Sequence, residues 1–586
     1  MNIATTDWVI IVVYMLAVVG VGVLAGFVRD KAGAGTHYFL ADNSLKWPVI
    51  GLAMFAANIS TVHLVSLAQS AYTSGLLYGN FEWMAGFTLI LLSLFFAPLY
   101  LRTRVPTLPD YLERRYNRNC RDALSIVSLF SAIVIHIGVA LFTAAAVLCF
   151  IFDIKGDAHI LGLSPMMFFI VALGTLTGIY TVIGGLLAVV WTESIQTVLL
   201  LLGAICITVV GYHEIGGWDA LSHTLATCPH PLLGKEGGPG LSTGTFLSML
   251  HSGNDASVIN NVPWYSILLG YPIIGIWYWC CDQTIVQRVL AAKDERHARL
   301  GPLFCALIKV LPVFFFVLPG VICVALVQRG FFPGGGPADS KDTYAFMITH
   351  LLPVGLRGLV VAAMLAAAMQ TCSAALNSSA TLFSYDIWKR WNPATSDLQL
   401  VRIGRWTTVV ATVLAIVLSP IFGHYSTIIQ GLNTLICYVA PPITCVFVVG
   451  VFWKRAGGRA AFVTMVSGAA MGVICFVADF FKDAISGKAG FLPPGSALTA
   501  GFDWFARGLL SDFMLTSFGM FCICLVIQVV ASLAMPETLK EEASNLVWKD
   551  WREPLRGEAH GHGMGNYRIL TVLVLVTFLT LYHIFR

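Results

Sequence analysis

The side chains that could do chemistry in this sequence are polar groups that interrupt long apolar runs. The densest set lies in GLAMFAANISTVHLVSLAQSAYTSG, at positions 51–75: Asn58, Ser60, Thr61, His63, Ser66, Gln69 and Ser70. Polar groups in a hydrocarbon environment cost several kcal/mol unless they are paired or hydrated. This composition predicts an interrupted helix beside a cavity, with free backbone carbonyls. The alternative is a packed helix whose polar groups bond to its neighbours.

Two further segments combine hydrogen-bonding groups with aromatic rings. Glu82 lies in NFEWMAG, where a carboxylate facing a cavity would suit the hydroxyl donors of a ligand, although lone interfacial carboxylates are common. Trp277, Tyr278 and Trp279 follow YPIIGI. An aromatic face with polar groups beside it is a usual grip for a pyranose ring, and an interfacial aromatic belt is the alternative. The polar run 282–288 is expected to mark the inner membrane interface.

Oxygen-bearing and charged residues continue further along the chain. Ala367 and Thr371 are four residues apart and share a helix face. Hydroxyls among small residues allow either close helix packing or coordination of a hard cation such as sodium through oxygen. Glu193 and Lys309 place single charges inside apolar runs. Such charges indicate a functional site by default, and a structural ion pair is the rival interpretation.

Composition tells what kind of protein holds these groups. Of 586 residues, 57% are hydrophobic and 11% are charged, and the mean hydropathy is +0.79. A soluble chain carries roughly 25% charged residues. The deficit excludes a soluble enzyme, a nucleic-acid binder and a disordered protein. We therefore expect an all-α polytopic membrane protein that contacts the lipid bilayer and no nucleic acid.

The apolar runs predict about fourteen transmembrane helices, among them adjacent spans at 165–185 and 187–212. One alternate set of loops holds 25 of the 35 Lys and Arg residues, and the opposite set, with both chain ends, holds eight. Loops rich in Lys and Arg remain cytoplasmic. We therefore expect a multi-pass protein of the cell membrane, plasma or inner, with both termini outside.

The interrupted segments occupy matching positions in two groups of five spans. FAANIS lies in the first span of one group, and YPIIGIW lies in the first span of the other. Discontinuous helices at matching positions indicate an inverted-repeat transporter with a site near the membrane midplane. The expected parts are an extra helix and inside loop (1–46), a first repeat (47–212), an outside loop (213–263), a second repeat (264–453) and three accessory helices (454–586).

Seven segments occur in the following order: YFLADNSLKWPVIGLAMFAANIS, GNFEWMAG, TLPDYLERRYN, YTVIGGLLAVVWTESIQTV, WYWCCDQTIVQRVLAAKD, AALNSSATLFSYDIWKR and APPITCVFVVGVFWKR. Together they resemble the sodium/solute symporter family, specifically its sodium/glucose cotransporter branch. The resemblance covers nearly the whole chain. It implies fourteen spans around a five-plus-five inverted-repeat core of the LeuT-like fold, with sodium-coupled uptake by alternating access.

The resemblance also implies roles for individual residues. The substrate contacts fall on Asn58, His63, Glu82, Tyr278, Trp279, Lys309 and Asn433, the last in place of a glutamine. The gates fall on Leu67, Phe81 and Tyr278. The sodium ligands fall on Ala56, Ile59, Ala367, Gln370 and Thr371, with Gln370 in place of a serine. Glu193 stands on the sodium exit route.

These roles imply symport of a neutral sugar of the glucose or galactose type with one sodium ion per cycle. The same fold carrying myo-inositol or another small polar solute, such as a sialic acid, is the alternative. A sodium-independent uniporter or a sensor is a more distant one. No HExxH, GxSxG or phosphate-binding glycine loop occurs. We therefore expect no enzyme and no organic cofactor, with sodium as the co-transported ion; the oligomeric state is not indicated.

Overall fold

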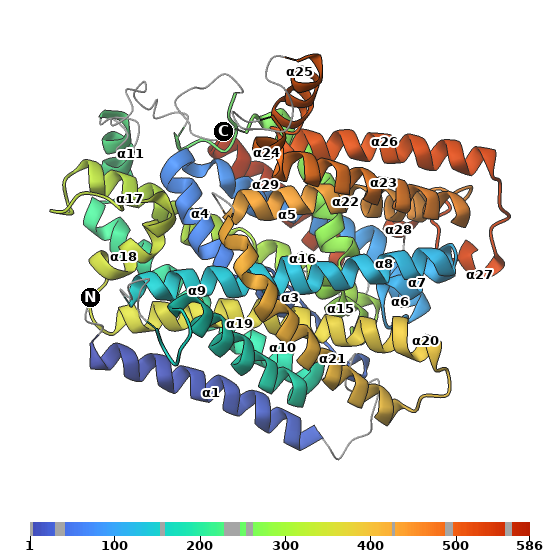
Figure 1. Ribbon diagram of the computed structural model, residues 1–586, viewed down its shortest axis with the longest axis horizontal. Helices are drawn as coiled ribbons and strands as arrows, with labels where there is room; N and C mark the ends of the chain where they lie inside the picture. The colour runs from blue at the N-terminus through green and yellow to red at the C-terminus, as the bar shows by residue number, and fades with distance from the viewer. Residues whose placement is uncertain are drawn as a thin grey trace.

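The chain is almost entirely helical. The computed structural model describes residues 4–29, 41–152, 159–227, 246–252, 262–424, 428–486, 496–556 and 565–586. In these ranges the pairings of β type are two isolated bridges, Leu45–Ala292 and Ile160–Leu163. Long helices lie side by side, many of them along the longest axis (Figure 1). The expected outside loop 213–263 falls outside the described residues at 228–245 and 253–261.

The helices follow one another closely along the chain. The first half contains α1 (Thr5–Arg29), α3 (Trp47–Asn58), α4 (Thr61–Ser74), α5 (Asn80–Leu91), α6 (Ala97–Thr103), α7 (Leu108–Arg115), α8 (Arg118–Phe130), α9 (Val139–Ile151), α10 (Pro165–Ile215), α11 (Trp218–Thr227) and α14 (Trp264–Ile276). The second contains α15 (Gln283–Leu290), α16 (Glu295–Ile308), α17 (Leu318–Gln328), α18 (Thr343–Leu351), α19 (Leu356–Leu382), α20 (Lys389–Trp391), α21 (Asp397–Leu418), α22 (Ile428–Phe452), α23 (Gly458–Phe480), α24 (Lys482–Ser486), α25 (Ala497–Asp503), α26 (Phe513–Ala534), α27 (Glu541–Ser544), α28 (Glu553–Arg556) and α29 (Tyr567–Ile584). Short π-helices join several of them, including η4 (Ser131–Gly138), η5 (Trp277–Cys281) and η8 (Phe383–Trp388).

The lengths of these helices fit a membrane. In the described part of the chain, eleven helices are long and apolar enough to span a bilayer, and Thr5–Val21 and Trp47–Asn58 are shorter apolar helices. The protein is therefore a multi-pass membrane protein, and the expected fourteen spans are an approximate count. The 51 residues of α10 would extend about 77 Å if straight, far beyond a bilayer core of ~30 Å. Gly185 (φ 60°, ψ −167°) kinks α10 where the sequence predicts a boundary between two spans.

The first interruption lies where the sequence predicts it. Helix α3 ends at Asn58, and α4 begins at Thr61. Ile59 (φ −78°, ψ 114°) and Ser60 (φ −116°, ψ 172°) are extended. The side chain of His63 accepts a hydrogen bond from the backbone N–H of Ser60 at 3.2 Å, which stabilises the start of α4. The break leaves backbone carbonyls of the last turn of α3 without helical partners.

The second interruption lies elsewhere than the sequence predicts. Helix α14 continues through Pro272 and passes into η5, and the backbone becomes extended only at Asp282 (φ −86°, ψ 124°). A Cβ on Gly270 would lie 2.4 Å from the carbonyl oxygen of Met514, so this glycine permits close packing of α14 on α26. The Asp282 carboxylate accepts a hydrogen bond from the backbone N–H of Thr284 at 2.7 Å and caps α15.

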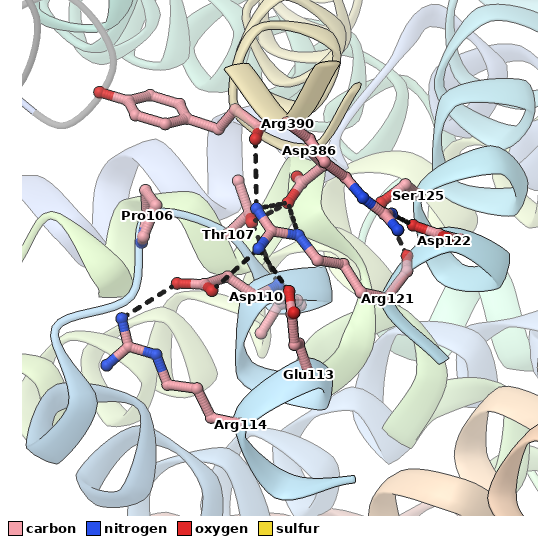
Figure 2. Close-up of polar contacts among 12 residues, drawn as sticks. Pro106, Thr107, Asp110, Glu113, Arg114, Arg121, Asp122, Ser125, Asp386 and Arg390 are labelled. Carbon is pink, nitrogen blue, oxygen red and sulfur yellow. Dashed lines mark hydrogen bonds and ion pairs between the residues drawn. The ribbon is translucent and has the colours of Figure 1, made fainter. Parts of the chain in front are cut away.

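A charged cluster ties η8, which directly follows α19, to α7 and α8. Figure 2 shows the guanidinium group of Arg121 between Asp386 and the pair Asp110 and Glu113. Its Nε donates to Asp386 Oδ1 at 2.8 Å, and its Nη1 donates to Glu113 Oε2 at 2.6 Å. Thr107 Oγ1 donates to the same oxygen of Asp386 at 2.9 Å. The cluster fixes the helix that carries Ala367 and Thr371 against the rest of the bundle.

Candidate substrate and sodium sites

A cavity lies beside both helix interruptions. It encloses about 790 Å³, its open mouth included, a size typical of small-molecule sites. Its walls come from the α3–α4 junction, α5, η4, α9, α14, η5, α19 and α22. Eight residues with expected roles line it: Asn58, His63, Phe81, Glu82, Tyr278, Trp279, Thr371 and Asn433. The folding of the chain thus brings most of the expected substrate contacts to one place.

Lys309 lies in the wall rather than on the cavity surface. It caps α16, is 1% exposed, and its Nζ donates to Glu82 Oε2 at 2.5 Å and also to Asn58 Oδ1. The ammonium group lies 5.3 Å from the ring centre of Trp279, within cation–π range. Lys309 therefore neutralises Glu82 and orients both cavity-lining partners, Glu82 and Asn58.

His63 extends this network on the opposite side of Glu82. Its Nδ1 accepts from the backbone N–H of Ser60 at 3.2 Å, which leaves the proton on Nε2. That Nε2 lies 3.9 Å from Glu82 Oε1. Since Glu82 is 1% exposed, it faces a cation on one oxygen and an imidazole N–H near the other. The arrangement presents hydrogen-bonding groups of both kinds without a net anionic charge.

The aromatic residues form a second wall. Tyr278 and Trp279 contact edge to face, with ring centres 5.3 Å apart. Phe81, an expected gate, stacks on Tyr78 at 5.8 Å, and its carbonyl oxygen accepts from the Tyr271 hydroxyl at 2.8 Å. Phe81 and Tyr278 line the cavity. Leu67, the third expected gate, is 1% exposed and is not part of the lining.

The expected sodium ligands lie where α3 ends and α19 passes it. Ala56, Ile59, Ala367 and Gln370 are fully buried and Thr371 is 5% exposed. Thr61 Oγ1 donates to the carbonyl oxygen of Met364 at 2.9 Å, which holds the interruption against α19. The Thr371 hydroxyl donates to the carbonyl oxygen of Ala367 at 3.3 Å. Carbonyl and hydroxyl oxygens of this kind suit a hard cation.

Gln370 and Glu193 meet at the contact between α19 and α10. Gln370 Nε2 donates to the backbone carbonyl oxygen of Glu193 at 3.3 Å. Glu193 Oε1 accepts from Arg288 Nη2 at 2.6 Å, and both side chains are fully buried. The other carboxylate oxygen, Glu193 Oε2, and the amide oxygen of Gln370 have no hydrogen-bond partner among the described residues. The polar residues of the run 282–288, Asp282, Gln283, Thr284, Gln287 and Arg288, are likewise buried among the helices, and their position at the inner membrane interface stays a prediction.

Sequence reasoning missed one residue of the cavity lining, His136, and its contact with the buried Asp282. His136 in η4 is 7% exposed and lines the cavity, and its Nε2 lies 3.3 Å from Asp282 Oδ2. Asp282 is 4% exposed. The available signal was a lone histidine in the apolar run SLFSAIVIHIGVALF, and a lone histidine names no partner.

Comparison with known proteins places these features in a family. Residues 38–468 match the model of the sodium:solute symporter family. "Sodium/glucose cotransporter 2" of Rattus norvegicus is 35% identical over 496 residues, which cover 81% of this chain and 72% of that protein. "Sodium/myo-inositol cotransporter 2" of Oryctolagus cuniculus is 31% identical over 570 residues, which cover 94% of this chain and 80% of that protein.

A solved structure shares the fold. The substrate-bound, outward-open form of a Na⁺-coupled sialic acid symporter superposes with a TM-score of 0.72, covering 92% of this chain and 99% of its own. The two sequences are 20% identical. The expected all-α, LeuT-like fold class is therefore confirmed.

Proposed function

Because the chain belongs to the sodium:solute symporter family, we propose that it moves a neutral sugar of the glucose or galactose type across the membrane together with sodium, by alternating access. Its membership shows a sodium-coupled symporter of the sodium/glucose cotransporter branch, and the members of this family are carriers rather than enzymes. The identity of the solute is the proposal.

One observation carries the choice of a neutral solute. The carboxylate of Glu82 is neutralised by Lys309 at 2.5 Å, so among the described lining residues no uncommitted Lys or Arg lies near Glu82 for an acidic solute. Glu82, His63 and Asn58 offer acceptors and donors, and Tyr278 with Trp279 offers an aromatic face. A polyhydroxylated ring uses both kinds of group. A sialic acid would need a partner for its carboxylate, and Lys309 is already engaged.

The adjacency of the two sites supports coupling. Asn58 contacts the solute in this proposal, and Ile59, the next residue, supplies a sodium ligand. Ala56, Ala367, Gln370 and Thr371 complete the sodium set, with Glu193 on the exit route. Sodium that orders the α3–α4 interruption against α19 also orders Asn58, and this shared element makes binding of one ligand favour the other.

The energetics of one sodium ion are adequate. A membrane potential of about 100 mV contributes ~2.3 kcal/mol per charge, and a tenfold sodium gradient adds ~1.4 kcal/mol. Their sum of ~3.7 kcal/mol would sustain a solute gradient of roughly 500-fold. We propose one sodium per cycle, repeats at 47–212 and 264–453 that rock against each other, and both termini outside.

Uptake into proteoliposomes tests the proposal. Labelled glucose, galactose, myo-inositol and a sialic acid are offered with an inward sodium gradient or an equal potassium gradient. We expect accumulation of a hexose in sodium alone. Accumulation of myo-inositol or sialic acid instead would replace the solute but keep the coupling. Equal uptake in both gradients would overturn sodium coupling in this protein.

Thr371→Ala should raise the sodium concentration needed for half-maximal uptake by about tenfold, because the site loses its one hydroxyl ligand. The solute KM at saturating sodium should change less than twofold. Thr371→Ser is the matched control, since it keeps the hydroxyl and should retain the sodium dependence of the wild type. An unchanged sodium dependence in Thr371→Ala would reject the sodium-site assignment.

A further inference from the structure

The helix interruption after η5 lies at Asp282, and its carboxylate contacts His136 at the cavity. This contact is separate from the network of Lys309, Glu82 and Asn58. Asp282 Oδ1 accepts from the backbone N–H of Thr284 at 2.7 Å, and Oδ2 faces His136 Nε2 at 3.3 Å. Both carboxylate oxygens are thus committed. The N-terminus of α15 stabilises a negative charge at this position. Asp282 is therefore an acceptor, and Nε2 of His136 carries the proton that it accepts.

This contact determines what His136 offers to the cavity. A neutral imidazole protonated on Nε2 has an unprotonated Nδ1, which can only accept a hydrogen bond. Nδ1 of His136 has no hydrogen-bond partner among the described residues, whereas the ring lines the cavity. The neighbouring lining residues Ile135 and Val139 are apolar. His136 is thus the polar group that this wall presents, and in its neutral form its Nδ1 is an acceptor.

The surroundings of His136 place it within reach of the solute. Its ring centre lies 5.9 Å from that of Tyr278, the aromatic residue proposed to stack on the sugar. Tyr278 and Asn58 both line this cavity. The polar groups around the cavity thus run from Asp282 through His136 and Tyr278 to the Asn58–Lys309–Glu82 network. The π-helix η4 that carries His136 is a distortion frequently found at functional sites.

We propose that His136 contacts the transported solute, that its Nδ1 accepts a hydrogen bond from one hydroxyl of that solute, and that Asp282 is the positioning residue that sets this role. The inference rests on the proposed function, because it requires a hydroxylated solute in the cavity. Discrimination between polyols that differ at one hydroxyl then depends on His136 as well as on Glu82 and Asn433.

Two substitutions separate the two ring nitrogens. In His136→Asn the amide reaches about as far as Nδ1, so an acceptor remains at the cavity. In His136→Gln the amide reaches about as far as Nε2, so the contact with Asp282 remains and the cavity loses its acceptor. We expect His136→Gln to raise the Kd of the solute about five- to tenfold, and His136→Asn to raise it less than threefold. The same pair of changes at the exposed His583 is the control.

Sodium-dependent binding of labelled glucose, galactose and myo-inositol to the purified full-length chain is the readout, followed by competition with monodeoxy analogues of the solute that binds. One analogue should lack the hydroxyl that contacts Nδ1. It should bind the wild type more weakly than the parent solute does, whereas His136→Gln should bind the analogue and the parent solute equally well. Asp282→Asn should act like His136→Gln, and the double variant should add little to either.

A uniform loss of affinity for every analogue in His136→Gln would overturn the contact and leave a structural role. An unchanged Kd, or a change in sodium dependence alone, would overturn it as well. Failure of the wild type to bind any of the three solutes would instead overturn the proposed function, and the inference with it. The wild-type measurement therefore distinguishes the two failures.

Discussion

Lys309→Met is expected to abolish sodium-driven solute accumulation and to lower the stability of the purified protein. The substitution keeps an unbranched apolar stem of the same length as the lysine stem but removes the ammonium group, whose Nζ lies 2.5 Å from Glu82 Oε2. Glu82 is 1% exposed, so its carboxylate would remain buried without a cation. Breaking a buried pair in this way costs about 3–5 kcal/mol. Uptake per reconstituted protein and the midpoint of thermal unfolding measure the two effects.

Two further variants separate stability from transport. Glu82→Gln combined with Lys309→Met removes both charges and should recover most of the lost stability, because no buried charge is left unpaired. Transport should stay absent, since the double variant lacks two groups that orient the solute. Lys482→Met is the control. The Nζ of Lys482 lies 3.0 Å from Asp479 Oδ1, and the lysine side chain is 37% exposed. An ion pair this exposed contributes little to stability. Wild-type uptake by Lys309→Met would contradict the role of this network.

The first interruption shows what a sequence pattern can predict. The polar side chains of Asn58, Ser60 and Thr61 follow a run of small residues, and they cannot face lipid. Their side chains also compete with the helix for backbone hydrogen bonds. Both the break and the nearby cavity therefore follow from local composition. The second interruption shows the limit. Gly270 and Pro272 have the composition of a break, but Gly270 is needed for the close approach of α26. Whether a glycine bends a helix or admits a neighbour depends on a segment more than 200 residues away.

The site also has features that the sequence predicts and features that depend on distant segments. The resemblance placed Asn58, Glu82 and Tyr278 at positions that the fold brings to one cavity. The partners that set their chemistry are tertiary: Lys309 meets Glu82 across 227 residues, and His136 meets Asp282 across 146. A sequence names charges that must pair in a membrane. It does not name which charge pairs with which.

The choice of partner for a buried charge matters most for the ion pair of Glu193 and Arg288. Arg288→Met should destabilise the protein by about 3–5 kcal/mol, because Glu193 is fully buried and loses its cation. Glu193→Gln combined with Arg288→Met should restore folding. If the pair has only a structural role, the folded double variant should show the same sodium dependence of uptake as the wild type.

We expect a different result: a folded double variant that needs about fivefold more sodium for half-maximal uptake. Glu193 Oε2 and Gln370 Oε1 have no partner among the described residues, and Gln370 precedes Thr371 and contacts the Glu193 backbone. On the proposed sodium route, a cation that leaves the Thr371 site would meet these oxygens. In the double variant, an amide replaces the Glu193 carboxylate. Uptake measured over a sodium series decides the matter. Recovery of the wild-type sodium dependence in the folded double variant would remove Glu193 from the sodium route and leave it as the anchor of Arg288.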